Sequence, residues 1–335
     1  MSHLRGTMKN VLLTGGTGFI GSNLARRLLA DGHRVTLLVR PDFTDWRIRD
    51  IREDIEIRIA NMQSRAEVET QMREAKPDWV FHLAAYGAYS FQKDGLEMAQ
   101  TNYLGTIHLV QACLRIGVEV MVHAGSSSEY GFKTHAPAEE EALDPNSYYA
   151  VTKAAATQFC RFAARAHMMP IPTLRLYSVY GPFEDPRRFI PTLIVHALEG
   201  RLPPLVGPDV VRDFIFIEDV TDAFVALASA PLSDPGSVYN LGTGTQISMQ
   251  QVVALASELF NLQVQPSWGS MPPRPWDTNI WVSNPGKIMS ELDWAPKVDI
   301  RQGLKWIARW LEFHPDWRRF YQRQILSPSL QPHEL

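Results

Sequence analysis

A tyrosine and a lysine four residues apart, Tyr149 and Lys153, have the clearest capacity for chemistry in this chain. They stand in a stretch, 147–157, whose composition is typical of the start of a helix, where residues four apart share one face. A lysine ammonium beside a phenol stabilises the phenolate and lowers its pKa from about 10 towards neutrality. Tyr149 is therefore predicted to be a general acid/base whose pKa Lys153 lowers.

A glycine-rich turn upstream predicts the partner that this chemistry needs. Gly15, Gly18 and Gly21 follow an apolar stretch at 9–14 and lead into a helical pattern at 22–29. Glycines at this spacing let the backbone approach a pyrophosphate, which the free amides of a helix N-terminus bind. A second strand pattern comes next, and strand, turn, helix and strand form the context in which this motif indicates a dinucleotide site.

Strand and helix patterns alternate along the first half of the chain. Such alternation builds a doubly wound parallel sheet that binds ligands at the carboxyl ends of its strands. The sequence therefore predicts an α/β, Rossmann-like fold. Strands are expected at 9–14, 34–39, 56–60, 79–83, 118–123 and 172–176, and helices at 22–29, 66–76, 95–116 and 148–167.

The composition changes after Tyr177, where proline and tryptophan become frequent and regular periodicity is lost. Residues 8–177 are expected to form the dinucleotide-binding domain. Residues 178–335 are expected to form a smaller, loop-rich substrate lobe, parts of which return to the first domain. Apolar residues at helical spacing in 304–311 predict a helix that packs against the body, whereas the prolines of 266–277 exclude regular structure.

The composition also argues against several classes of protein. A net charge of −3 over 335 residues disfavours nucleic-acid and membrane partners, which normally need a basic patch. No stretch approaches the ~20 apolar residues of a membrane span, and the N-terminus lacks the apolar core of a signal peptide. Cys113 and Cys160 are expected to be free thiols in a reducing cytoplasm. The ten histidines show no metal-ligand spacing, so no metal site is expected.

Further motifs follow one another along the chain, and their order is as informative as their content. They are Gly15-Gly16-Thr17-Gly18-Phe19-Ile20-Gly21, His82-Leu83-Ala84-Ala85, Asn102-x-x-Gly105-Thr106, Ser126-Ser127-Ser128-Glu129-Tyr130-Gly131, Tyr149-x-x-x-Lys153, Tyr180-Gly181-Pro182, Arg212-Asp213-Phe214-Ile215-Phe216-Ile217-Glu218-Asp219, Asn240-Leu241-Gly242-Thr243-Gly244 and Arg274-x-x-Asp277. Together they resemble the extended short-chain dehydrogenase/reductase family, in the branch of nucleotide-sugar epimerases, dehydratases and 4-ketoreductases. The resemblance extends from Lys9 to about Pro296.

The resemblance implies that a serine holds the substrate oxygen, that Tyr149 moves the proton and that Lys153 binds the nicotinamide ribose. The serine is Ser126 if the motif is aligned without a gap, and Ser127 if the one residue that relatives have in addition is left out just before the Tyr-Gly pair. His82 is expected to be a packed core residue. The cofactor contacts that the resemblance implies are Gly15, Gly18, Phe19, Ile20, Gly21, Arg40, Asn61, Met62, Leu83, Ala84, Ala85, Asn102, Tyr149, Lys153 and Tyr177.

The resemblance also implies a nucleotide-sugar substrate. Arg212 and Arg274 are expected to hold its diphosphate, because guanidinium groups match phosphate oxygens bidentately. Asp277 is expected to orient Arg274, and Tyr86 to contact the substrate. Glu129 has two interpretations: a proton-transfer group like the acids of the dehydratases, or a solvated glutamate at the end of a strand.

Residues after the second expected strand bear on the cofactor. NAD-selective relatives usually have an acid where this chain has Val39, followed by Arg40. Arg40, with Arg47 nearby, suits a 2′-phosphate, so NADP(H) is expected. NAD is the alternative, because Asp42 or Asp45 could turn towards the ribose.

The leading functional hypothesis is therefore NADPH-dependent reduction of a nucleotide-linked 4-keto sugar, as in deoxysugar biosynthesis. A nucleotide-sugar 4-epimerase with tightly bound NAD is the main alternative. A 4,6-dehydratase is disfavoured because Ser128 stands where dehydratases have an aspartate. A non-catalytic NADP-binding sensor would not need the Ser, Tyr and Lys set, and Arg212 and Arg274 disfavour a small-molecule carbonyl reductase.

In relatives, two helices pair with their symmetry mates in a four-helix bundle, which makes a homodimer with a two-fold axis. Here they correspond to 95–116 and 148–167, which should lie side by side on one face of the sheet. Their apolar surface is expected to exceed what one sheet contact needs. It includes Ile107, Val110, Leu114, Ala155, Phe159 and Phe162.

Overall fold

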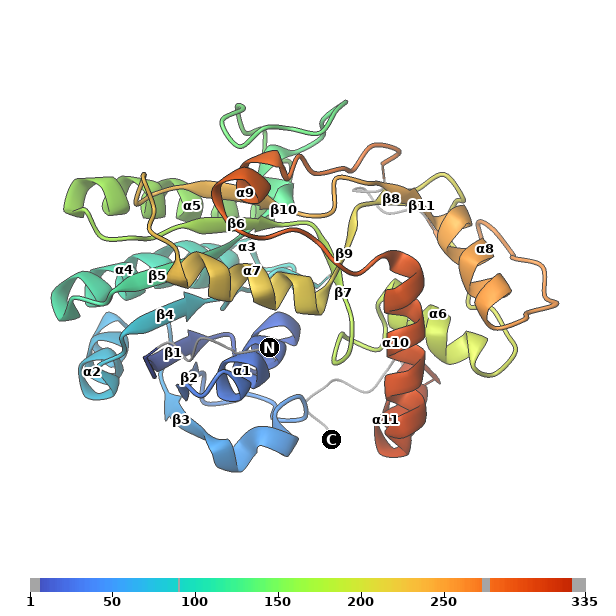
Figure 1. The fold of residues 1–335 in the computed structure, drawn as a ribbon, viewed down its shortest axis with the longest axis horizontal. Helices are drawn as coiled ribbons and strands as arrows, with labels where there is room; N and C mark the ends of the chain where they lie inside the picture. Colours follow the sequence, from blue (N-terminus) through green and yellow to red (C-terminus); the bar gives the residue numbers. More distant parts are fainter. Residues whose placement is uncertain (1–6, 90, 273–277, 327–335) are drawn as a thin grey trace.

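A seven-stranded parallel sheet forms the centre of the protein (Figure 1). The structure is a computed structural model that describes residues 7–89, 91–272 and 278–326. The strand order β3-β2-β1-β4-β5-β6-β10 confirms the predicted doubly wound α/β fold. Chain order reverses between β1 and β4, where such sheets open a crevice for ligands. The strands are β1 (Asn10–Thr14), β2 (Arg34–Val39), β3 (Ile55–Ile59), β4 (Trp79–His82), β5 (Val120–Ser126), β6 (Thr173–Leu176) and β10 (Val238–Leu241).

Helices bury both faces of the sheet. Successive strand residues point to opposite faces, so neighbouring Leu12 and Leu13 of β1 enter two different cores. This is why the strands read as continuous apolar runs rather than alternating patterns. The core of Leu13 includes α1 (Phe19–Ala30) and α7 (Ile217–Ser229), and that of Leu12 includes α2 (Arg65–Ala75), α4 (Gly105–Ile116) and α5 (Tyr148–His167).

Three elements from the second half of the chain complete this sheet domain, and one of them, α9 (Gly286–Glu291), packs against β10. Strand β10 pairs in parallel with β6, with Val238 opposite Thr173. Helix α7 packs beside α1 on the same face of the sheet. Strand β10 was not among the predicted strands, although Asn240 and Leu241, which begin one of the sequence motifs, lie at its end.

The helix expected at 95–116 consists of three parts. A short helix, α3 (Gly95–Met98), is followed by a π-helical segment, η2 (Ala99–Leu104), and then by α4. Such π-helical segments occur frequently at functional sites. Here the segment carries Asn102, whose side chain is buried.

The remaining elements form the smaller lobe, which has its own apolar core. Leu193, Val252, Leu304 and Tyr321 belong to this core. The helix expected at 304–311 is α10, which packs in the core of this lobe rather than against the body of the sheet domain as predicted. The elements are β7 (Ser178–Tyr180) paired with β9 (Phe214–Phe216), β8 (Val211–Arg212) paired with β11 (Ile247–Ser248), α6 (Phe189–Ala197), α8 (Met249–Leu259), α10 (Ile300–Phe313) and α11 (Pro315–Leu326).

Helices α4 and α5 lie side by side on one face of the sheet, as predicted (Figure 1). Val110 is 0% exposed and packs inside the chain, so its place in the predicted outer surface is wrong. Phe162 on α5 is 68% exposed, and Phe159 is half-buried. An apolar outer surface therefore remains on α5.

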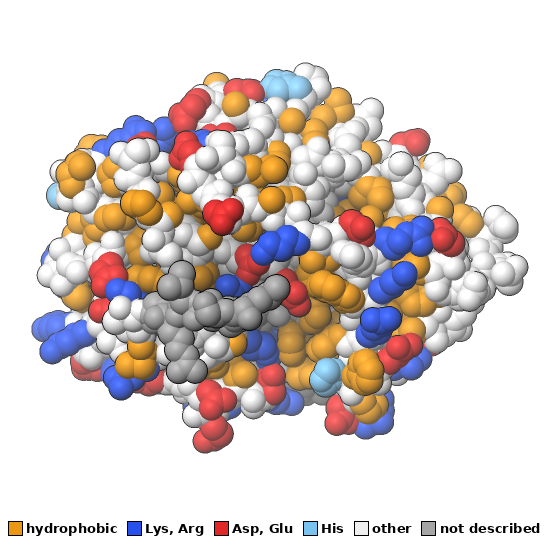
Figure 2. Space-filling view, in the orientation of Figure 1, with side chains coloured by type: hydrophobic (Ala, Val, Ile, Leu, Met, Phe, Trp, Pro, Cys, Tyr) orange, Lys and Arg blue, Asp and Glu red, His pale blue; other side chains and the backbone are white. Residues whose placement is uncertain are grey.

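The composition also led to expectations about membrane spans, surface charge and the two cysteines. No helix within the described ranges is long and apolar enough to cross a membrane. On the face shown in Figure 2, basic and acidic side chains are interspersed. Cys113 and Cys160 are buried free thiols, as predicted, and burial raises the pKa of each.

Candidate active site

Ser126 and Tyr149 meet at the carboxyl end of β5. Ser126 is the last residue of that strand, and Tyr149 lies in the first turn of α5, which begins after the capping residue Ser147. The Ser126 side chain lies beside the Tyr149 phenol, where it acts to lower the pKa of the tyrosine. The structure thus brings Ser126 to the tyrosine. Ser127 is buried in the next turn, where it lines a small cavity with Tyr177.

Lys153 lies one helical turn beyond Tyr149, but it does not act on the phenol as predicted. Its Nζ donates a hydrogen bond of 2.5 Å to the Ala124 carbonyl oxygen, and burial lowers the pKa of the lysine. Burial raises the pKa of Tyr149, while Ser126 and Arg188 act to lower it. Lys153 is not among the groups that shift the pKa of Tyr149, and its ammonium is bound to the Ala124 carbonyl oxygen, so the structure does not bear out the prediction that Lys153 lowers this pKa.

Glu129 fits neither of its two predicted interpretations. Its side chain is 0% exposed, so it is not a solvated glutamate. Its carboxylate forms an ion pair with Arg175 at 2.9 Å, and it also accepts hydrogen bonds from the Ser126 amide and the Thr157 hydroxyl. A carboxylate whose two oxygens are both engaged by Arg175, the Ser126 amide and the Thr157 hydroxyl is poorly placed to exchange protons with a substrate.

Arg175 is a residue of the site that the sequence motifs did not single out. It lies on β6 beside β5, and it is the largest of the fully buried side chains. Besides Glu129, its guanidinium donates to the Tyr130 hydroxyl at 2.8 Å and to the Glu139 carbonyl oxygen at 2.9 Å. An arginine inside an otherwise apolar strand is the signal that could have identified it, because buried charges are almost always paired.

The glycine-rich turn fits a dinucleotide. Gly15 has a φ of +69°, and a Cβ added there would lie 2.6 Å from the Ala84 amide nitrogen and from the Leu83 carbonyl carbon. Only glycine therefore allows the turn to approach the segment after β4 this closely. No side chain caps the N-terminus of α1, and its first turn holds no acidic residue. The free amides near Phe19 and Ile20 thus suit a pyrophosphate.

Of the two arginines expected near the adenosine end of the cofactor, one is exposed and the other is buried. Arg40 is exposed after β2 and pairs with Asp42 at 3.2 Å. Arg47 is buried, donates to the Phe183 carbonyl oxygen and stacks on Trp46. Its predicted role beside a 2′-phosphate is therefore wrong.

Asn61 and Met62 follow β3. Asn61 is exposed and accepts a hydrogen bond from the Gln63 amide, while Met62 packs against Gly105 at the start of α4. Both remain predicted cofactor contacts.

Asn102 joins the segment after β4 to the catalytic helix. Its amide pairs with the backbone of Tyr86 at 2.7 and 2.8 Å and donates to the Thr152 hydroxyl at 3.0 Å. Asn102 therefore holds the Leu83–Tyr86 segment against α5, in addition to any cofactor contact. Ala85 is exposed on this segment.

His82 is a packed core residue, as predicted. It is bonded to the hydroxyls of Thr14 and Thr106, and burial lowers its pKa to about 3. Among the described residues, no three His, Cys, Asp or Glu side chains are grouped so that they could hold a metal ion.

On the substrate side, Arg212 ends β8, and its guanidinium donates to the Val211 carbonyl oxygen. Arg274 and Asp277 lie outside the described residues. Arg188 is a second residue that the sequence motifs did not single out. It lies over the Tyr89 ring and donates to the Ala88 carbonyl oxygen, which ties the segment after β4 to the start of α6.

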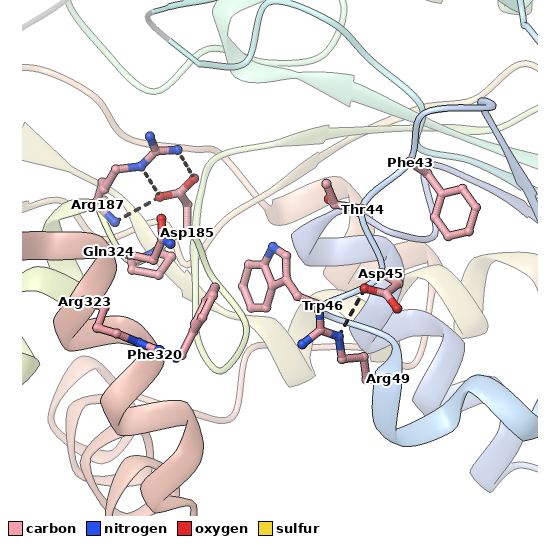
Figure 3. Close-up of a pocket in the computed structure, with 11 residues that line it drawn as sticks. Phe43, Thr44, Asp45, Trp46, Arg49, Asp185, Arg187, Phe320, Arg323 and Gln324 are labelled. Atoms are coloured by element: carbon pink, nitrogen blue, oxygen red, sulfur yellow. Dashed lines mark hydrogen bonds and ion pairs between the residues drawn. The ribbon is translucent and has the colours of Figure 1, made fainter. Parts of the chain in front are cut away.

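A cavity of about 450 Å³ lies between the loop after β2, the loop before α6 and the last helix, α11 (Figure 3). Arg187 pairs bidentately with Asp185 on one side of it, and Arg49 pairs with Asp45 on the other. Ser126 and Tyr149 do not line this cavity. It is therefore separate from the reactive pair.

Comparisons with known proteins agree with this geometry. Residues 11–242 match the model of the NAD dependent epimerase/dehydratase family. The chain is 30% identical over 314 residues to UDP-glucose 4-epimerase of Mycolicibacterium smegmatis, covering 90% of this chain and 97% of that protein. In its fold it is similar to the UDP-glucose 4-epimerase of Thermus thermophilus in complex with NAD, with a TM-score of 0.80, 27% identity, and 91% and 99% of the two chains covered.

One relative is a longer protein with three activities. The chain is 27% identical to a trifunctional UDP-glucose 4,6-dehydratase/UDP-4-keto-6-deoxy-D-glucose 3,5-epimerase/UDP-4-keto-L-rhamnose-reductase of Arabidopsis thaliana, over 93% of this chain. The chain spans about half of that protein, 48% of its length. With its parallel sheet, glycine-rich turn and Ser-Tyr-Lys set in place, the chain belongs to the NAD dependent epimerase/dehydratase family, as its motifs predict.

Proposed function

We propose that this protein uses NADP(H) to reduce the 4-keto group of a nucleotide-linked sugar. The observation that carries the proposal is the Ser126–Tyr149 pair, together with the ion pair that engages the nearby Glu129 carboxylate with Arg175. Such a site supplies one proton donor and one positioned hydroxyl, which is what the reduction of a carbonyl group needs.

The chain's own residues have distinct roles in this reaction. The Ser126 hydroxyl binds the carbonyl oxygen, and the Tyr149 phenol donates the proton to it. Burial raises the pKa of Tyr149, which keeps the phenol protonated at neutral pH and suits it to act as the acid. The turn from Gly15 to Gly21 and Lys153 hold the dinucleotide, which supplies the hydride when bound. Arg212 binds the diphosphate of the substrate.

The position of Glu129 argues against a 4,6-dehydratase. Water loss from a sugar needs a further acid and base beside the tyrosine, and in this chain Ser128 stands where dehydratases have an aspartate. The Ser128 hydroxyl lies 2.7 Å from that of Ser126, and Glu129 is held by Arg175. No carboxylate in this turn is left to move the additional protons.

The NADP(H) assignment depends on Arg40. The last residue of β2 is Val39, which is buried, so no acidic residue stands at this position. The next residue, Arg40, is exposed. A guanidinium there favours a 2′-phosphate. Asp42, which pairs with Arg40, keeps NAD as the alternative cofactor.

A nucleotide-sugar 4-epimerase with tightly bound NAD is the second candidate. The similarity to the Mycolicibacterium smegmatis epimerase supports it, because the alignment covers nearly the full length of both chains. The same Ser126–Tyr149 pair would serve, since an epimerase oxidises and re-reduces one carbon within a single cycle.

Two measurements test these proposals. Nucleotide released from the purified protein by denaturation is identified first, and tightly bound NAD would favour the epimerase. The protein is then assayed with NADPH and a nucleotide-linked 4-keto-6-deoxyhexose, and separately with UDP-glucose. Oxidation of NADPH by the keto sugar supports the reductase. Formation of UDP-galactose without net NADPH oxidation supports the epimerase, and release of water from the sugar would overturn both.

A further inference from the structure

We propose that Glu129 and Thr157 form a positioning link that holds Ser126 in register with Tyr149, with Arg175 as its buried counter-charge. Neither Glu129 nor Thr157 touches the reacting atoms in this proposal, and both act through Ser126. The proposal rests on the proposed function only where its readout is turnover.

One oxygen of the Glu129 carboxylate is hydrogen-bonded both to Ser126 and to the helix that carries Tyr149. Glu129 Oε1 accepts a hydrogen bond from the Ser126 amide at 2.8 Å and another from the Thr157 hydroxyl at 2.9 Å. Ser126 belongs to β5 and Thr157 to α5. Tyr149, Lys153 and Thr157 follow at intervals of four, so they share one helix face. The link therefore connects the strand that carries the serine to the helix that carries the tyrosine.

The turn after β5 also sets the direction of the serine hydroxyl. Residues Ser127–Tyr130 form a short 3₁₀ helix, η3, whose N-cap is Ser126. The Ser126 hydroxyl accepts a hydrogen bond from the Ser128 amide at 3.3 Å and lies 2.7 Å from the Ser128 hydroxyl. The Glu129 carboxylate accepts from the Ser126 amide, which completes a capping box. The backbone of Ser126 is thus held by Glu129, and its side chain by Ser128.

Arg175 makes a buried carboxylate tolerable at this point. Its Nε donates to Glu129 Oε2 at 2.9 Å, and the two side chains are 1% and 0% exposed. An isolated carboxylate in such surroundings would lose its charge, whereas a paired and hydrogen-bonded one keeps it. Arg175 is held in turn by the Tyr130 hydroxyl and the Glu139 carbonyl oxygen, and the Tyr130 hydroxyl donates to the Asn240 side chain.

Gly125 provides the space that the carboxylate occupies. A Cβ at this position would lie 2.8 Å from Glu129 Oε1 and 2.8 Å from a methyl group of Thr173. Gly125 also stands opposite Arg175 in the pairing of β5 with β6. Strand β5 therefore has no side chain at the position where the Glu129–Arg175 ion pair lies against it. Gly125 leaves the space that the Glu129 carboxylate needs, so it supports the same link.

The first experiment compares Thr157→Val with Thr157→Ser, which differ in the hydroxyl donor at this position. Because small misplacements of a reacting pair can cost up to about 100-fold in rate, we expect kcat of Thr157→Val to fall roughly tenfold. KM and cofactor affinity should stay within about twofold, since ground-state binding is not removed. Thr157→Ser should restore kcat. Equal kcat in the two variants would overturn the proposal.

The second experiment separates positioning from stability. Replacing a buried ion pair by apolar residues is often neutral for stability, so Glu129→Leu combined with Arg175→Met should keep the melting temperature near that of the wild type. Positioning predicts that this double variant has a low kcat in spite of its stability. If the melting temperature and kcat both match the wild type, Glu129 has no positioning role.

A third measurement does not depend on the substrate. Amide hydrogen exchange over 120–131 should be faster in Thr157→Val than in the wild type and in Thr157→Ser, because the link from α5 to the turn is lost. Absence of turnover by the wild-type protein on every nucleotide sugar would refute the proposed function alone. Unchanged exchange in Thr157→Val would then refute the link.

Discussion

Lys153 Nζ donates its hydrogen bond to the carbonyl oxygen of Ala124, two residues before the serine that meets Tyr149. The lysine charge is thus bound to β5, while the tyrosine one turn earlier on α5 lies beside Ser126, the last residue of that strand. Strand β5 and helix α5 are thus connected at three positions along the helix, Tyr149, Lys153 and Thr157. Catalysis should therefore be sensitive to changes that alter how α5 sits on β5.

Tyr149→Phe tests the acid. The variant keeps the ring and its packing but has no proton to donate, so turnover should fall by roughly 10²–10⁴-fold, the usual contribution of a positioned acid/base. Fold and cofactor binding should be retained, as checked by circular dichroism and by titration with NADPH. Full turnover of this variant would refute the mechanism.

Ser126→Ala and Ser127→Ala test the geometry. Ser126 lies beside the Tyr149 phenol, whereas Ser127 is buried beside Tyr177. We expect kcat to fall at least tenfold in Ser126→Ala, because one hydrogen bond to the developing charge is lost. Ser127→Ala should have a kcat near that of the wild type. The opposite result would mean that the turn has another conformation when substrate binds.

The pH dependence of reduction tests the state of Tyr149. An acid is active while protonated, and burial raises its pKa above the ordinary value of about 10. The rate should therefore be constant through neutral pH and fall only in the alkaline range. Arg188 lowers the pKa of Tyr149, so Arg188→Gln should move the alkaline limb to higher pH. A limb that moves to lower pH would contradict the assignment of that limb to Tyr149.

Arg40→Ala and Arg47→Ala form a matched pair for cofactor choice. Arg40 is exposed at the end of β2, and Arg47 is buried against Phe183 and Trp46. Removing Arg40 should narrow the difference between NADPH and NADH binding by about 1.5–3 kcal/mol, the value of a charge-assisted hydrogen bond. Arg47→Ala should lower the melting temperature and leave the NADPH/NADH ratio unchanged. Equal affinities for the two cofactors in the unmutated protein would remove the argument for NADP(H).

Phe162→Glu tests the predicted homodimer. Phe162 is the most exposed of the apolar residues named for this face. An isologous interface repeats each residue on both subunits, so one substitution places two charges in it. Light scattering at micromolar concentration should show a dimer for the wild type and a shift towards monomer for the variant. Val110→Ala is not informative here, because Val110 is buried within the chain.

The sequence alone determined the sheet strands β1 to β6, the glycine-rich turn and the helix that carries Tyr149 and Lys153, but not the seventh strand, β10. Each of these depends on a local signal. Continuous apolar runs predict strands that are buried on both faces, and the spacing of the glycines predicts a turn that binds a dinucleotide. The interval of four residues places Tyr149 and Lys153 on one face of a helix. The strands β1 to β6 lie within a few residues of their predicted ranges. The family followed from the order of short motifs, which is also a property of the linear chain.

The tertiary structure decided which atoms meet. Ser126 and Ser127 are adjacent in the chain, and only the end of β5 relative to α5 determines which of them reaches Tyr149. The roles of Glu129 and Arg47 depended on burial, because each is held by partners far away in the sequence, Arg175 and Phe183. The pKa of Tyr149 depended on the balance between burial and several charges from different elements. Such quantities are sums over neighbours in space, and the spacing of residues along a chain does not contain them.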